Sequence, residues 1–109
     1  SNPMAAIVKV PGVVVTLGGN EYIMAPLTAG PLKQILPRLQ GLGTESNPLD
    51  ALDLAVDVAF HSLKRNYPDI AREQVENEFV DLSNMMTIIQ AGAGVSGLAA
   101  KAEPGAGEA

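Results

Sequence analysis

The chain has 109 residues, with twelve acidic against seven basic side chains and a formal net charge of −5. This length suits a single domain. The acidic balance argues against non-specific binding to nucleic acid or to an anionic membrane, because both require a cationic surface. The chain has no cysteine, which excludes disulfide scaffolds, thiol nucleophiles and cysteine-bound zinc.

The N-terminal stretch carries no recognisable targeting signal. There is no run of about 20 apolar residues, so the sequence predicts no membrane span. Lys9, Pro11 and Gly12 interrupt the first apolar stretch, which argues against a secretory signal. Residues 1–3, Ser-Asn-Pro, are interpreted as an expression scar that precedes a native start at Met4. Together with the missing cysteine, these features favour a cytoplasmic protein.

A β-hairpin is expected near the N-terminus. The β-branched run Val-Val-Val-Thr-Leu at residues 13–17 predicts a strand. Residues 18–20, Gly-Gly-Asn, predict a tight turn, because these residues accept the positive φ that the turn requires. Residues 21–24 would return as the second strand, and residues 7–10 could add a third beyond Pro11-Gly12. Since a lone hairpin is marginal in water, this one is expected to lie against helices or another subunit.

Two helices are expected in the first two thirds of the chain. Thr28 is the expected N-cap of the first, in which Pro37 should introduce a kink or end its first half. The clearest helix spans residues 48–67. Asn47 is its expected N-cap, and Pro68 stops it.

Two further helices complete the expected fold. Asp69 is expected to cap a short one, and Asp81 or Ser83 to begin the last. The sequence therefore predicts an α+β protein, mostly α, in which an N-terminal β-hairpin is followed by a compact bundle of about four helices and a disordered C-terminal tail. The expected organisation is a disordered N-terminus at residues 1–6, a single domain at 7–98 and a disordered tail at 99–109.

Negative charge is concentrated in residues 45–81. This segment contains nine acidic and three basic side chains, which gives it a net charge of −6. Within this segment Asp50, Asp53 and Asp57 follow i, i+3, i+7 spacing, which places them on one helical face. Clustered carboxylates could supply some of the ligands of a metal ion, but such a site would need further ligands. A solvated strip that also suits the helix dipole is the favoured interpretation. These three residues are the candidate acidic rim of an interface.

Two other sequence patterns bear on a possible binding or catalytic site. Gly92, Gly94 and Gly97 fit G-x-G-x-x-G, but a dinucleotide site needs a strand before the glycines and a helix after them. Here a helical pattern precedes them, so a helix terminus is the favoured interpretation. His61 is the only histidine, and no sequence motif supplies it with a nucleophile or an acid. We therefore expect no enzyme, no catalytic residue, no metal and no cofactor.

The supply of apolar helical faces is generous for so small a chain. Leu54 and Val58 lie almost opposite the main stripe of their helix, and methionines in the last helix repack easily. Such residues could belong to the core, to a self-association surface or to a client-binding surface. The sequence does not show which residue belongs to which of these three. If they form an interface, aspartate at both Leu54 and Val58 would disrupt assembly but leave helicity. The interface candidates are Leu54, Val58, Met85, Met86 and Ile89, and a homo-oligomer is a reasonable hypothesis.

Several short stretches carry a family resemblance through their order along the chain. The most specific is Arg-Asn-Tyr-Pro-Asp-Ile at residues 65–70, before a short acidic helix. These stretches, which cover most of residues 13–98, resemble the tail assembly chaperones of long-tailed bacteriophages. The pieces are residues 26–30 with 36–39, residues 63–70 followed by 72–76, and residues 82–84 leading to 94–98.

The resemblance implies a small, mostly helical, non-enzymatic assembly factor, the short form encoded upstream of the tape measure protein. Members act in the host cytoplasm, bind the tape measure protein, help recruit major tail tube subunits, commonly self-associate and are absent from the mature virion. Many also exist in a longer, frameshifted form, for which the C-terminal tail would be an attachment point. Two alternatives stay open. One is a tail structural or completion protein retained in the virion. The other is a transcription-associated or antitoxin-like regulator, disfavoured by the lack of a basic recognition helix.

Overall fold

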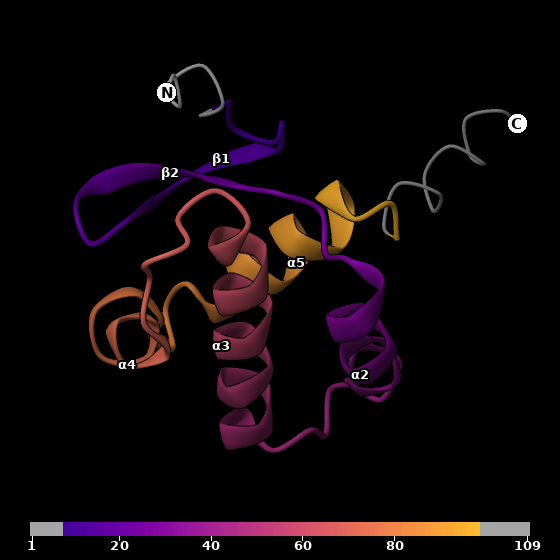
Figure 1. Cartoon of the computed structure of the whole chain (residues 1–109). Coiled ribbons are helices and arrows are strands. Elements are labelled where there is room, and N and C mark those ends of the chain that lie inside the picture. Colours follow the sequence, from indigo (N-terminus) through magenta and orange to yellow (C-terminus); the bar gives the residue numbers. More distant parts are fainter. Residues whose placement is uncertain (1–7, 99–109) are drawn as a thin grey trace, which may run out of the picture.

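A computed structural model describes residues 8–98 and shows a β-hairpin that lies across one end of a helical bundle (Figure 1). The predicted class, α+β and mostly α with an N-terminal hairpin and four helical segments, is confirmed. The segments expected to be disordered, 1–6 and 99–109, lie outside the described residues. In chain order the elements are β1 (Val13–Leu17), β2 (Asn20–Met24), α2 (Ala29–Gln40), α3 (Pro48–Lys64), α4 (Arg72–Gln74), the π-helix η1 (Val75–Phe79) and α5 (Met85–Val95).

The hairpin follows its local sequence signals closely. β1 and β2 pair antiparallel in a register that sets Leu17 opposite Asn20, so the strand begins at Asn20 and the turn is only two residues long. Gly18 and Gly19 have φ of +57° and +86°, the left-handed values that a type I′ turn requires. Residues 8–10 form no strand. The possible third strand is therefore not formed there, because Pro11-Gly12 redirects the chain and Val10 bonds to a side chain instead.

The first two helices begin where predicted, but other details of both helices differ from the prediction. Asn47 Oδ1 accepts a hydrogen bond from the Leu49 amide at 2.8 Å, which confirms the N-cap of α3. Thr28 occupies the N-cap position of α2 but makes no side-chain capping bond, and Pro37 does not end that helix. α3 ends at Lys64, three residues earlier than predicted. It stops early because the next side chains turn back to bond the hairpin.

The third helical segment differs from its prediction in start and type. Asp69 does not cap it, since the helix begins at Arg72 after Ala71. The chain then widens into the π-helix η1, closed by a hydrogen bond from the Val80 amide to the Val75 carbonyl at 3.1 Å. Its two apolar residues, Val75 and Phe79, are both buried.

A capping box precedes α5. Asp81 Oδ1 accepts from the Asn84 amide at 3.0 Å, and Asn84 Oδ1 accepts in return from the Asp81 amide at 2.9 Å. Asp81 Oδ1 also accepts from the Ser83 hydroxyl at 2.6 Å. The last helix was expected to begin at Asp81 or Ser83, but α5 begins later, at Met85 after Asn84. Asp81 instead accepts the hydrogen bonds of the turn that precedes the helix.

Asp81 should make stability depend on acidity. The pKa of its carboxyl lies below the ordinary 3.8, first because the Ser83 hydroxyl bonds it and then because the Asn84 amide does. In the acidic range below 3.8 the unfolded chain therefore binds more protons than the folded one, so stability falls as the pH falls. We expect Asp81→Asn, which keeps an acceptor oxygen but does not titrate, to flatten this loss. Thermal unfolding midpoints from pH 7 down to the acidic range would measure it, and equal slopes for both proteins would contradict it.

The glycines of α5 have structural roles. Gly92 lies against α3, where an added Cβ would come within 2.2 Å of Val58 Cγ1. Gly94 also belongs to the helix, and Gly97, with φ +90°, ends it. The Leu98 amide bonds the Ala93 carbonyl at 2.9 Å, and the Gly97 amide bonds the Gly94 carbonyl at 3.0 Å. This pair of bonds is a Schellman motif. The helix-terminus interpretation of the three glycines is thereby confirmed.

Candidate functional site

The five interface candidates separate into buried and accessible residues. Leu54, Val58 and Ile89 are only 1%, 0% and 3% exposed and belong to the core between α3 and α5. For these three the structure corrects the interface interpretation, because α5 and α2 cover the second apolar face of α3. Met85 is half-buried, and Met86 is 43% exposed. Only the two methionines are thus placed to meet another molecule.

Met85 and Met86 line an apolar surface pocket of about 440 Å³, here called the Met85–Met86 pocket. It lies between the first turns of α3 and α5 and the loop after α2. Pro48 and Leu42 contribute further apolar walls. The sequence pattern assigns neither residue to a binding surface, because Pro48 indicates only the start of a helix and Leu42 belongs to no apolar stripe. The full lining is Leu42, Gly43, Thr44, Ser46, Pro48, Ala51, Met85 and Met86.

Two leucines that do not line this pocket are exposed to solvent. Leu49 follows the pocket-lining Pro48 and is 65% exposed. Leu82, in the turn before α5, is 64% exposed. Single exposed leucines are common on protein surfaces and need no special explanation.

Two of the three acidic rim candidates border the pocket. Asp50 and Asp53 are exposed and line, with Arg38, a neighbouring hollow of about 330 Å³. Leu42 and Ser46 line both hollows, so the hollow that holds these two carboxylates adjoins the Met85–Met86 pocket. Asp50 and Asp53 are therefore placed as a charged rim would be.

Asp57 is not a free rim residue. Its carboxylate bonds Arg38 of α2 at 2.5 Å and also pairs with Arg72 of α4, leaving the side chain 16% exposed. Arg72 lies in addition 5.4 Å from the centre of the Phe60 ring. Asp57 thus joins three helices. We correct its assignment, because it lies further along α3 than the other two aspartates, where α2 and α4 approach.

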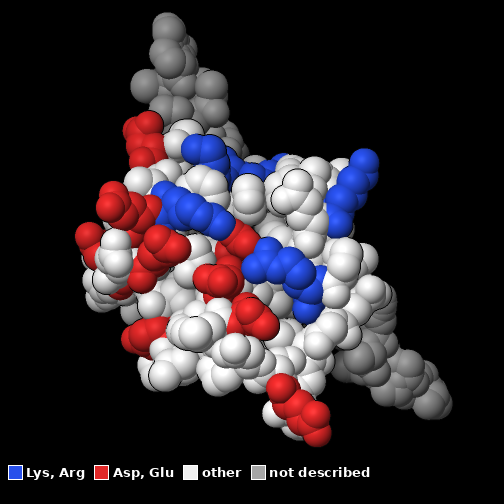
Figure 2. Space-filling view, turned by 90° about the horizontal axis from the view of Figure 1, so that it is seen from below, with Lys and Arg blue, Asp and Glu red and all other residues white. Residues whose placement is uncertain are grey.

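Charged side chains of both signs meet on the end of the bundle opposite the hairpin. Figure 2 shows basic side chains lying directly beside acidic ones there.

A third hollow, of about 370 Å³, is lined by His61 together with the ion-paired Arg38, Asp57 and Arg72. The described residues of its lining include no hydroxyl or thiol nucleophile. Burial, and secondarily the charge of Lys64, lowers the pKa of His61 below its ordinary value.

Within residues 8–98, no three His, Asp or Glu side chains are grouped so that they could hold a metal ion. None of the helices in the described part of the chain is long and apolar enough to cross a membrane.

The stretch that carries most of the family resemblance holds the hairpin to the bundle. Asn66 Oδ1 accepts from the Val10 amide at 2.6 Å, and its Nδ2 donates to the Val10 carbonyl at 2.9 Å and to the Ile23 carbonyl at 3.3 Å. The Tyr67 hydroxyl accepts from the Ile23 amide at 2.8 Å. Arg65 donates to the Pro26 carbonyl at 2.9 Å. We call Arg65, Asn66 and Tyr67 the hairpin anchor. No local sequence pattern predicts this role, because the backbone groups that the anchor residues bond are about 40 or more residues away in the sequence.

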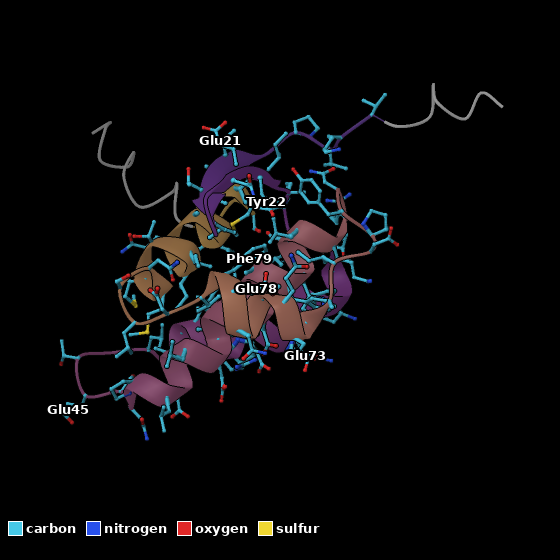
Figure 3. The ribbon with its side chains drawn as sticks, turned by 90° about the vertical axis from the view of Figure 1, so that its left-hand side faces the viewer. Glu21, Tyr22, Glu45, Glu73, Glu78 and Phe79 are labelled. Atoms are coloured by element: carbon cyan, nitrogen blue, oxygen red, sulfur yellow. The ribbon has the colours of Figure 1, made fainter. Side chains whose placement is uncertain are left out.

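Aromatic and hydroxyl contacts reinforce the hairpin anchor. Figure 3 shows Tyr22 on the hairpin directed toward Phe79, with Glu21 pointing away. The ring centres of Tyr22 and Phe79 are 5.0 Å apart, and those of Tyr22 and Tyr67 are 5.3 Å apart. The buried Ser62 hydroxyl donates to the Ala25 carbonyl at 2.6 Å. These contacts fix the hairpin in one position over α3 and η1.

No family model, curated protein or solved structure matches this chain. The resemblance to tail assembly chaperones therefore stays a prediction that rests on the stretches quoted above. The structure adds a physical role for one of them, because residues 65–67 anchor the hairpin.

Proposed function

We propose that this chain is a non-enzymatic assembly chaperone of bacteriophage tails. It would bind the tape measure protein in the host cytoplasm and help recruit major tail tube subunits. Two observations support the proposal. Several short stretches resemble the family and follow the same order along the chain, and the Met85–Met86 pocket is accessible and has an acidic border. The pocket carries most weight, because it offers a surface for an apolar partner.

The pocket suits one apolar stripe of a partner helix. Before the tail tube encloses it, a tape measure protein exposes long apolar helical stripes, which need cover to stay soluble. A helix would lay side chains at i, i+3 and i+4 into a groove of this kind. Met85 and Met86 can repack around different side chains along such a stripe. Asp50 and Asp53 would stay in water at the border and keep the complex soluble.

Met86→Asp is expected to weaken client binding at least about tenfold, because it places a charge where an apolar side chain should dock. Met86 is 43% exposed, so the fold should tolerate the change. The measurement is co-expression with the tape measure protein, followed by the amounts of soluble and co-purified client. Thr87→Asp is the matched control, since it adds the same charge to an exposed neighbour on the same helix.

Two results would count against the proposal. In one, wild-type chain neither co-purifies with the tape measure protein nor raises its solubility. In the other, Met86→Asp and Thr87→Asp bind the client equally well, which would leave the pocket without a role. Finding the chain in purified particles would instead favour the alternative, a tail structural or completion protein. The chaperone proposal also places its gene between those of the major tail protein and the tape measure protein.

A further inference from the structure

The outer edge of β1 carries unused backbone hydrogen-bonding groups. In the observed register, with its two-residue turn, Val13, Val15 and Leu17 exchange backbone bonds with β2. The amide and carbonyl groups of Val14 and Thr16 therefore point away from β2. Within the described part of the chain, no hydrogen bond reaches these outward groups.

The opposite edge of the same sheet, formed by β2, has outward backbone groups that are hydrogen-bonded. Ile23, the β2 residue opposite Val14, has its outward amide bonded by Tyr67 and its outward carbonyl bonded by Asn66. Among residues 8–98 no side chain covers the outer edge of β1 in this way, and the Val14 side chain is 57% exposed. Proteins usually protect exposed strand edges with charge, proline or a bulge. β1 holds only three valines, a threonine and a leucine, so it is open to pairing with another strand.

The sequence around β1 is symmetric in a way that fits pairing with itself. Residues 12–18 read Gly-Val-Val-Val-Thr-Leu-Gly, centred on Val15. In an antiparallel pairing with Val15 opposite its own copy, the glycines at the two ends fall opposite each other. Val13 then lies opposite Leu17, and Val14 opposite Thr16. Each pair joins small, β-branched or aliphatic side chains, which are favourable cross-strand neighbours, and none brings like charges together.

We infer that β1 pairs antiparallel with β1 of a second copy of this chain, in the register that sets Val15 opposite Val15. The two hairpins then form one four-stranded sheet around a twofold axis. Such a sheet removes the weakness of a two-stranded sheet, since three or more strands are usually needed for independent stability. The register also aligns outward donors with outward acceptors, because Val14 and Thr16 exchange places across the axis. This inference does not depend on the proposed chaperone function.

The first test removes one outward donor from the edge. In Thr16→Pro the lost amide faces away from β2, so the hairpin ladder is kept. Glu21→Pro is the matched control, because Glu21 lies directly opposite Thr16 and its amide faces the other edge. Sedimentation equilibrium should give twice 11.3 kDa for the wild type and for Glu21→Pro. Thr16→Pro should give a single chain mass with an unchanged far-UV circular dichroism spectrum.

The second test reads the register through a disulfide, using the absence of native cysteine. In the inferred pairing Val15 and its copy form a non-hydrogen-bonded pair, with Cα atoms about 4.5 Å apart, which a disulfide can bridge. Val14 and its copy are offset diagonally, about 7–8 Å apart. Mild oxidation should therefore link Val15→Cys into a covalent dimer much faster than Val14→Cys, although Val14 is the more exposed residue.

Three outcomes overturn the inference. A wild-type mass of 11.3 kDa does so, whether the edge is free or covered by residues 1–7 of the same chain. An unchanged dimer in folded Thr16→Pro shows that copies associate elsewhere. Faster cross-linking of Val14→Cys than of Val15→Cys excludes the register.

Discussion

Replacing Leu54 and Val58 together by aspartate is expected to abolish folding. The two side chains are 1% and 0% exposed in the middle of α3. Burying two unpaired carboxylates there costs several kcal/mol each. A domain of this size has a free energy of unfolding of only about 5–15 kcal/mol. We therefore expect the helical circular dichroism signal to be weak and the cooperative thermal transition to be lost.

This result would be the reverse of what the sequence alone suggests, where the same double substitution disrupts assembly and leaves helicity. Leu49→Asp is the matched control on the same helix, because Leu49 is 65% exposed. It should change the free energy of unfolding by no more than about 0.5 kcal/mol. A double variant that keeps its helicity and a cooperative transition but loses oligomer mass would restore Leu54 and Val58 as interface residues.

Local chemistry made the position of the hairpin and the starts of α2 and α3 predictable. Adjacent glycines after a β-branched run indicate the turn, although the prediction included Asn20 in it and the structure pairs Asn20 with Leu17. Asn47 before Pro48 likewise carries its own capping chemistry. In each case the deciding atoms lie within a few residues of one another, so the sequence contains the whole interaction.

Tertiary contacts decided the points that the sequence left open. α3 has two apolar faces, and only the positions of α2 and α5 show that Leu54 is covered while Met86 is not. Asp57 follows the same spacing as Asp50, but it is withdrawn from the rim by two arginines from other helices. The hairpin anchor is the same kind of case, since its role depends on where the hairpin lies. No short pattern contains such information.

The junction of α3 and α5 leads to the other prediction of large effect. Gly92→Ala should destabilise the fold by about 1–3 kcal/mol, because the new Cβ would lie 2.2 Å from Val58 Cγ1, in a side chain that is fully buried. Alanine gains about 1 kcal/mol over glycine in helix propensity, so the steric cost must exceed this gain to appear. Thermal and urea unfolding would measure the net change.

Gly94→Ala separates the steric cost from propensity. It lies in the same helix with nothing within 4 Å of an added Cβ, so it should stabilise the fold by up to about 1 kcal/mol. Adding Val58→Ala to Gly92→Ala should relieve the overlap, so that the double variant is more stable than the sum of the single effects by about 1 kcal/mol or more. Equal effects of the two glycine substitutions, or strict additivity in the double variant, would show that α5 does not pack on α3 through Gly92.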